Sequence, residues 1–84
     1  MKVTVIGSHL CPDTLYALNR LSAAGGIEID FKSISASLGD LRTYISLRES
    51  NPAYEEVRGS TKLGIPCFIL EDGTVTRELG DVLK

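Results

Sequence analysis

The sequence predicts an α/β fold in which a four-stranded mixed sheet is flanked by helices. Apolar runs typical of strands alternate along the chain with apolar stripes of helical period. A strong hairpin signal, Asp72-Gly73, separates the last two strand-like runs. The expected order is therefore β-α-β-α-β-β with a short closing helix. With 84 residues, the chain has room for a single domain, residues 1–84.

The first strand and the first helix are indicated by clear patterns. Residues 2–6 (Lys-Val-Thr-Val-Ile) are apolar and β-branched, which is typical of a buried strand. Pro12 fits the first position of a helix, where its missing N–H costs nothing, and Gly25-Gly26 ends this helix. Its expected apolar face consists of Thr14, Ala17, Leu18 and Leu21. A helix of this length allows the strands on either side of it to pair in parallel.

A second strand and a second helix follow. Residues 27–31 (Ile-Glu-Ile-Asp-Phe) alternate apolar and acidic side chains, which predicts a strand with one buried face. Ser37, with Asp40 three residues later, predicts the start of a helix, and residues 50–52 (Ser-Asn-Pro) predict its end. The expected apolar stripe of this helix consists of Leu38, Leu41, Tyr44 and Ile45. Residues 53–58 are expected to form a further short helical turn.

The remaining residues predict a hairpin. Residues 65–70 (Ile-Pro-Cys-Phe-Ile-Leu) form the expected third strand, with Pro66 at its start or on a sheet edge, since proline cannot donate to a ladder. Residues 74–76 (Thr-Val-Thr) form the fourth strand, antiparallel to the third. Residues 79–84 leave room for one closing turn of helix.

Composition and charge exclude several classes of function. Apolar residues make up 43% of the chain and the formal net charge is −2, which argues against a nucleic-acid partner and a membrane surface. We see no bilayer-spanning run and no signal-peptide pattern, so we expect a cytoplasmic protein. Thiols are kept reduced there, and the two cysteines suggest chemistry more than a structural disulfide. Their spacing is not that of a zinc site, and no metal is expected.

Cys11 is the principal candidate for chemistry. It stands between the first strand and the first helix, in the sequence Cys-Pro-Asp-Thr (residues 11–14). A sulfur there faces the unpaired N–H groups and the positive dipole end of the helix, which favours the thiolate, the reactive form of cysteine. The Thr14 hydroxyl, one helical turn further on, is a candidate hydrogen-bond donor to the sulfur. An inert buried cysteine is the alternative, but such cysteines rarely open a helix as Cys-Pro.

These motifs together resemble the glutaredoxins of the thioredoxin superfamily. The resemblance rests on Cys11-Pro12 after the first strand, on Ile65-Pro66 at the third strand and on the Asp72-Gly73 hairpin, and it covers nearly the whole chain. It implies a thioredoxin-like (glutaredoxin) fold and a glutathione-dependent thiol-disulfide oxidoreductase that serves cell redox homeostasis. Glutathione is then a co-substrate, the partners are glutathionylated or disulfide-containing proteins, and a monomer is expected.

The resemblance also implies roles for individual residues. Cys11 matches the family's nucleophile, and Pro66 matches a proline that follows a cis peptide bond beside the nucleophile. The backbone of Ile65 is then expected to pair with glutathione. Pro12 and Asp13 of the motif are expected to contact glutathione as well.

Two charged residues complete the expected glutathione site. Asp81 is the nearest match to an aspartate that receives the glutathione amino group in the family. Lys62, in the loop before Pro66, is the favoured partner for a glutathione carboxylate. The alternatives to Lys62 are Arg42, Arg48 and Arg58 in the second helical region.

The motif departs from both common glutaredoxin types. Thr14 stands where dithiol glutaredoxins carry a second cysteine, and Cys-Pro-Asp-Thr does not match the Cys-Gly-Phe-Ser of the monothiol iron–sulfur type. One nucleophile suffices to reduce glutathione mixed disulfides, so this monothiol cycle is our leading hypothesis. The alternatives are a glutathione-ligated iron–sulfur cluster carrier, a reductase that forms a Cys11–Cys67 disulfide, and a fold retained only as an interaction module.

Cys67 and His9 each allow two interpretations. Cys67 is either a resolving thiol or a small apolar core residue. Successive side chains of a strand face opposite sides of a sheet, so if Pro66 faces Cys11, Cys67 points into the core, which is the interpretation that we favour. His9 either helps to hold the thiolate or is a solvated loop residue, the more common case.

Overall fold

The computed structural model describes all 84 residues, which alternate between strands and helices. The strands are β1 (Lys2–Gly7), β2 (Glu28–Ser33), β3 (Cys67–Ile69) and β4 (Val75–Thr76). The helices are α1 (Pro12–Ala24), α2 (Leu38–Ser50) and α3 (Leu79–Val82), and a 3-10 turn, η1 (Pro52–Tyr54), follows α2. None of the helices combines the length and the apolar character that crossing a membrane requires.

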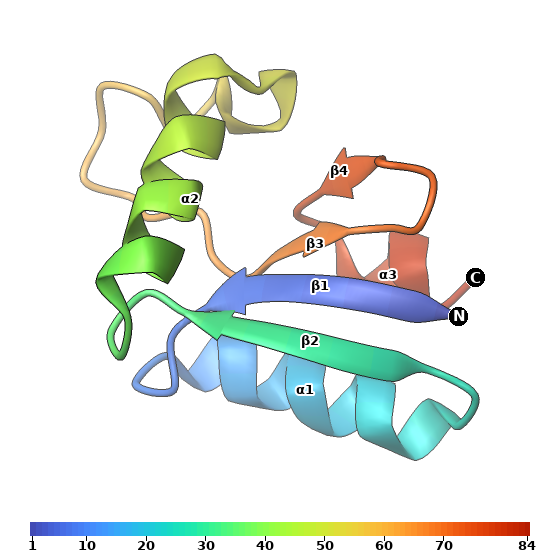
Figure 1. The fold of residues 1–84 in the computed structure, drawn as a ribbon. Helices are drawn as coiled ribbons and strands as arrows, with labels where there is room; N and C mark the ends of the chain where they lie inside the picture. The colour runs from blue at the N-terminus through green and yellow to red at the C-terminus, as the bar shows by residue number, and fades with distance from the viewer.

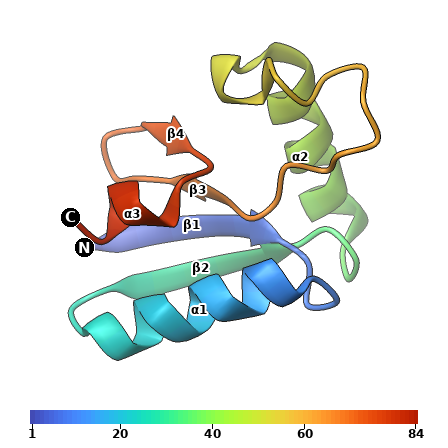
Figure 2. The same ribbon diagram turned by 180° about the vertical axis from the view of Figure 1, so that it is seen from behind.

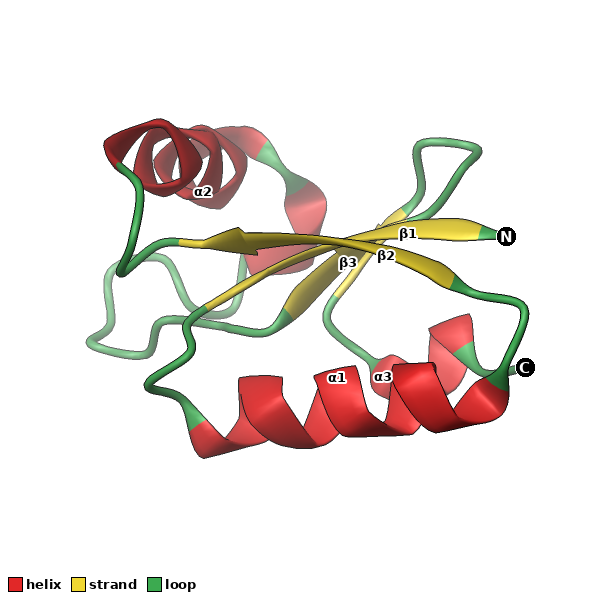
Figure 3. Cartoon of the chain, turned by 60° about the horizontal axis from the view of Figure 1, so that its bottom comes forward, coloured by secondary structure: helices red, strands yellow, loops and turns green.

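The four strands form one mixed sheet in the order β2-β1-β3-β4. β1 pairs with β2 in parallel, and β3 pairs with both β1 and β4 in antiparallel fashion. α1 and α3 lie on one face of the sheet, whereas α2 lies on the other face near one end of the strands (Figures 1 and 3). The expected α/β class, with a mixed sheet flanked by helices, is therefore confirmed.

The core consists of two clusters, one on each face of the sheet. The cluster beneath α1 and α3, the two helices that Figure 2 shows from behind, contains Val3, Val5, Ala17, Leu21, Phe68 and Val82. The cluster beneath α2 contains Ile6, Tyr44, Tyr54, Val57 and Cys67. Because side chains alternate along a strand, β1 and β3 each contribute to both clusters. The expected apolar face of α1 is confirmed, with Thr14, Ala17 and Leu21 buried and Leu18 partly buried.

The apolar stripe expected on α2 was partly wrong. Leu38 and Ile45 are 74% and 46% exposed, whereas Tyr44 is buried and Leu41 and Leu47 are partly buried. The reason is that α2 covers only one end of the sheet (Figure 1). Fewer of its apolar side chains are therefore buried than the sequence pattern predicts.

The boundaries of the other elements follow the local signals closely. The Ser37 hydroxyl caps α2 by accepting a hydrogen bond from the Asp40 N–H at 3.2 Å. The Asp72 carboxylate accepts from the Thr74 N–H at 2.9 Å in the hairpin turn, and the Thr74 hydroxyl, together with this N–H, lowers the pKa of Asp72. β3 is shorter than expected, because it begins only after Pro66, which has no N–H to donate.

Gly64 joins the irregular segment after η1 to Ile65-Pro66. Its φ angle is +72°, in the left-handed region that favours glycine. A Cβ atom on Gly64 would lie 2.8 Å from the Cε1 atom of the Tyr54 ring and 3.3 Å from a Val57 methyl group. This position therefore requires glycine both for its backbone conformation and for close packing on the second cluster.

We expect Gly64→Ala to destabilise the protein more than Gly59→Ala, a matched control. Gly59 also has a positive φ of +81°, but its Cβ would meet nothing within 4 Å, so its replacement costs about 1 kcal/mol of backbone strain. Gly64→Ala adds a crowding term of ~1–3 kcal/mol. Urea denaturation of both variants measures the difference, and equal losses of unfolding free energy would refute the packing argument.

Candidate active site

The pairing of β1 with β3 brings Cys11 and Pro66 to the same edge of the sheet. Ile6, near the end of β1, is opposite Cys67, the first residue of β3. Segment 8–11, which follows β1, and Ile65-Pro66, which precede β3, therefore leave the sheet at the same end (Figure 1). Ligand sites in α/β sheets are favoured at the carboxyl ends of the parallel strands, and this is that end of β1.

Cys11 is the N-cap residue of α1 and is partly exposed. Its backbone is extended, with φ −98° and ψ 119°. Its N–H donates to the Ser8 carbonyl at 3.0 Å, and its carbonyl accepts from the Leu15 N–H at 3.1 Å. The sulfur makes no capping hydrogen bond. The thiol thus stands at the open end of α1, where the amides of the first turn lack intrahelical partners.

Thr14 ties the start of α1 to the end of β1. Its side chain is fully buried, and its hydroxyl oxygen accepts a hydrogen bond from the Ser8 N–H at 3.3 Å. The contact with β1 is close, since a Cβ on Gly7 would lie 2.5 Å from this oxygen. The structure gives the Thr14 hydroxyl no hydrogen bond to the Cys11 sulfur. Thr14 positions the loop that carries Cys11.

Serine hydroxyls hold the Cys11 loop against the segment after β2. The Ser8 hydroxyl pairs with the Ser35 hydroxyl and accepts from the Leu10 N–H at 3.1 Å. The His9 Nδ1 lies 3.1 Å from the Ser33 hydroxyl. Sequence reasoning did not identify these serines as part of the site. The available signal was that polar residues follow both parallel strands, whose carboxyl ends share one edge of the sheet.

The peptide bond between Ile65 and Pro66 is cis, as the resemblance implies. The backbone N–H and C=O of Ile65 make no hydrogen bond within the chain, and both residues are partly exposed. Polar groups of the backbone are strong donors and acceptors that favour a partner. Ile65 can therefore pair with an extended backbone from outside the molecule.

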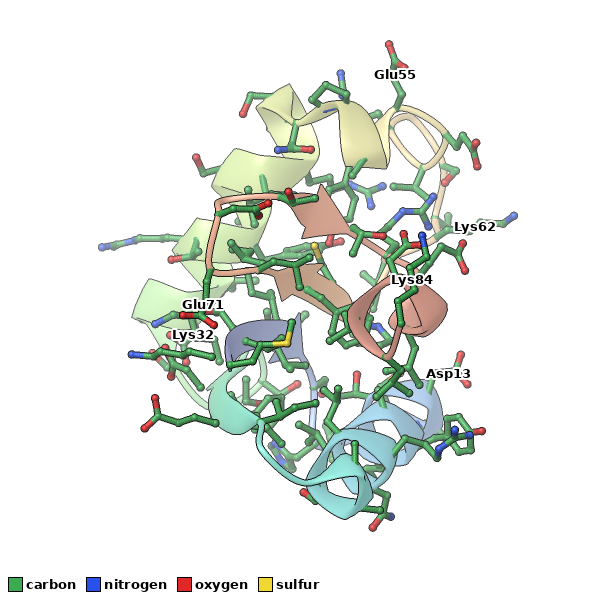
Figure 4. All side chains as sticks on the ribbon, turned by 90° about the vertical axis from the view of Figure 1, so that its right-hand side faces the viewer. Asp13, Lys32, Glu55, Lys62, Glu71 and Lys84 are labelled. Atoms are coloured by element: carbon green, nitrogen blue, oxygen red, sulfur yellow. The ribbon has the colours of Figure 1, made fainter.

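The charged residues expected at the site differ in whether they already have partners within the chain. Lys62 and Asp13 are exposed and have no ion-pair partner within the chain, and the Lys62 side chain extends outward from its loop (Figure 4). Pro12 is exposed beside Cys11. These three residues remain available to a ligand.

Asp81, in the first turn of α3, already has two partners. The Thr76 hydroxyl donates to its Oδ2 atom at 2.6 Å, and the Lys84 ammonium lies 3.8 Å from its Oδ1 atom. The Lys84 side chain is 81% exposed, and such exposed ion pairs are weak. An ammonium group of a ligand can therefore replace Lys84 at little cost.

Two of the three arginines considered as carboxylate partners are engaged within the protein. Arg48 donates to backbone carbonyls of the segment before Gly64, and Arg58 donates to the Asn51 carbonyl at 2.8 Å. Arg42 is exposed on α2. Lys62 thus remains the freest cation near Pro66.

Cys67 lies in the cluster beneath α2 and is completely buried. Burial is the main cause that raises the pKa of its thiol, and it also raises the pKa of the neighbouring Tyr54 phenol. The Tyr54 hydroxyl lies beside the Cys67 sulfur but makes no hydrogen bond of regular geometry. Both groups are therefore protonated at neutral pH.

The sheet separates the two cysteines, and neither is in a disulfide. Cys67 packs on the face that α2 covers, whereas Cys11 begins α1 beneath the other face (Figure 3). This arrangement favours Cys67 as a core residue over Cys67 as a resolving thiol.

Comparison with known proteins finds a similar sequence. The chain is 33% identical over 72 residues to a protein of Haemophilus influenzae that is described as an uncharacterized protein, and the match covers 86% of this chain and 83% of that protein. The chain belongs to the family of this Haemophilus protein. No model of a protein family matches the chain, and no solved structure matches it.

The buried pair Cys67 and Tyr54 predicts that stability falls at alkaline pH. In the unfolded chain these groups release their protons above about pH 8.5 and pH 10, whereas the folded protein retains them because its pKa values are raised. The folded state then binds more protons than the unfolded state, so the unfolding free energy decreases as pH rises, by up to ~1.4 kcal/mol per pH unit for each group.

Urea denaturation between pH 7 and pH 10 measures this decline. Cys67→Val removes the thiol and should flatten the curve above about pH 8.5, whereas Cys11→Ser, which removes the partly exposed thiol, should leave the slope closer to that of the native protein. Parallel curves for the native protein and Cys67→Val would contradict the assignment.

Proposed function

We propose that this chain has a thioredoxin-like fold and acts as a glutathione-dependent thiol-disulfide oxidoreductase of the glutaredoxin type. The observation that carries the proposal is the presence of an accessible Cys11 thiol at the start of α1, at the same sheet edge as the cis Ile65–Pro66 bond. The parallel β1–β2 pair and the antiparallel β3–β4 hairpin are compatible with the topology that such a fold needs.

Cys11 is the nucleophile of the proposed reaction. Its thiolate, the reactive form of cysteine, attacks the glutathione sulfur of a mixed disulfide between glutathione and a second thiol. The original disulfide bond breaks, and the second thiol leaves and takes up a proton. A further glutathione thiolate then attacks the Cys11–glutathione disulfide, which regenerates Cys11 and releases oxidised glutathione. Each cycle thus transfers two electrons to the substrate disulfide.

The glutathione moiety binds across the edge between α1, β3 and α3. The free N–H and C=O of Ile65 pair with the extended peptide backbone of glutathione, as in the addition of a strand. Lys62 attracts a glutathione carboxylate and Asp81 the amino group, whereas Pro12 and Asp13 border the sulfur. We propose a cytoplasmic monomer whose partners are glutathionylated or disulfide-containing proteins.

The monothiol cycle is favoured over a Cys11–Cys67 dithiol cycle. The Cys67 thiol is completely buried, and burial raises its pKa, so it is a poor attacking group. A disulfide between the two residues would also require Cys67 to leave the cluster beneath α2. No such movement is needed when glutathione resolves the intermediate.

Turnover of a glutathione mixed disulfide tests the proposal. We expect Cys11→Ser to lose at least about a hundredfold in rate because the attacking sulfur is gone. Cys67→Ser, the matched control, should retain nearly the native rate if it remains folded. Full activity of Cys11→Ser would exclude the proposed mechanism, and a large loss in folded Cys67→Ser would favour the dithiol cycle.

Alkylation distinguishes the two thiols without reference to a substrate. Iodoacetamide should label the folded protein once, at Cys11, and a second label should enter only after unfolding exposes Cys67. We expect Cys11 to react in the folded protein because its thiol is free and partly exposed, and bound oxidised glutathione should slow the reaction. Intact-mass measurements follow both labels, and a Cys11 that stays unlabelled in the folded protein would argue against the proposal.

A further inference from the structure

One side chain, that of Arg48, makes four hydrogen bonds to the segment between η1 and β3. Residues 57–64 contain no helix or strand, yet four of their carbonyl groups accept hydrogen bonds from the guanidinium of Arg48. The Nη2 atom donates to Val57 at 2.9 Å and to Ser60 at 3.0 Å. The Nη1 atom donates to Lys62 at 2.6 Å and to Leu63 at 3.3 Å.

Arg48 is itself fixed by its neighbour on α2, Tyr44. The Nη1 atom of Arg48 lies 3.2 Å from the Tyr44 hydroxyl oxygen, and this hydroxyl donates in turn to the Leu63 carbonyl. The Tyr44 ring is buried and contacts the Tyr54 ring edge-on, with 5.9 Å between the ring centres. The guanidinium is thus bonded to a residue of the core cluster beneath α2, and through its own hydrogen bonds it connects residues 57–64 to that cluster.

The end of this segment carries the groups to which we assign glutathione binding. Lys62 lies within it, and Ile65, with its free backbone groups, follows it directly after Gly64. Arg48 bonds to the carbonyls of Lys62 and Leu63, three and two residues before Ile65. The backbone on which the ligand would align therefore depends on a residue of α2 that lies outside the proposed site.

We propose that Arg48 is a positioning residue that fixes the Lys62–Ile65 backbone for the peptide part of glutathione. This inference rests on the proposed function. A guanidinium suits the task because its planar fork can serve several carbonyls at once, whereas the ammonium of lysine is a compact point charge. Arg48 is not a carboxylate ligand, since its hydrogen bonds all go to the protein's own oxygen atoms.

Steady-state kinetics of Arg48→Lys and Arg48→Gln test this inference. With a glutathione mixed disulfide as the varied substrate, we expect KM to rise about tenfold and kcat to stay within about twofold, since binding geometry is loosened and the nucleophile is untouched. Arg42→Lys and Arg42→Gln are matched controls on the exposed face of the same helix, and both should behave like the native protein.

A second measurement links the kinetic effect to the segment itself. Trypsin cleaves after lysine, and the Lys62 carbonyl belongs to the bond that would be cut. Release of that carbonyl from Arg48 should make folded Arg48→Lys and Arg48→Gln several-fold more sensitive to cleavage at this bond than the Arg42 variants. The iodoacetamide reactivity of Cys11 should not change in any of the four proteins.

The outcomes separate this inference from the proposed function. Unchanged KM in Arg48→Lys and Arg48→Gln, with an active native protein, overturns the role of Arg48 alone. A parallel fall of kcat and of Cys11 alkylation shows general damage and also overturns it. A native protein that turns over the mixed disulfide no faster than Cys11→Ser removes the proposed function, and this inference falls with it.

Discussion

The antiparallel pairing of β1 with β3 is the constraint on which the rest of the molecule depends. It consists of three residue pairs, from Thr4–Ile69 to Ile6–Cys67, and it joins the parallel β1–β2 unit to the carboxyl-terminal hairpin. β1 lies between β2 and β3. Because side chains alternate along a strand, those of β1 face both α1 and α2. The same short pairing brings the Cys11 loop and Ile65-Pro66 to one edge of the sheet.

The register of this pairing also decides the different character of the two cysteines. A shift of one residue along β3 would exchange its faces, so Phe68 would point to α2 and Cys67 to the cluster beneath α1. In the observed register Cys67 occupies a small space beside Tyr54 and is sealed from solvent. Cys11 is not part of any strand, and its exposure depends on the turn that its N–H closes with the Ser8 carbonyl.

Local signals in the sequence predicted most elements because each has its own chemical cause. Pro12 begins α1, Ser37 caps α2 through the Asp40 N–H, and Asp72 closes the hairpin turn. The buried face of α2 was not predictable in this way. Leu38 is as apolar as Leu41, and only the position of α2 over one end of the sheet leaves the former in solvent.

The site shows the same division. Cys11 was predicted from a short motif and the cis bond before Pro66 from the resemblance to glutaredoxins, whereas the serine contacts depend on the parallel pairing of β1 with β2. The contacts of Arg48 could not be predicted from the sequence, because the carbonyl groups that it binds lie 9 to 15 residues away in a segment without periodic structure. Because most arginines are exposed to solvent, a single arginine in a helical pattern is normally predicted to be a surface residue.

Backbone polar groups explain why the segment before β3 needs such a side chain. Irregular backbone has no ladder to satisfy its carbonyl groups, and each must find another partner or water. Arg48 satisfies four of them on the side that faces α2, which orders the chain as far as Leu63. Ile65 lies just beyond this support and before the first ladder pair of β3, so its N–H and C=O stay unpaired within the chain. The position at which we propose that glutathione pairs therefore lies between the carbonyl groups bound by Arg48 and the first residue of β3 that pairs with β1.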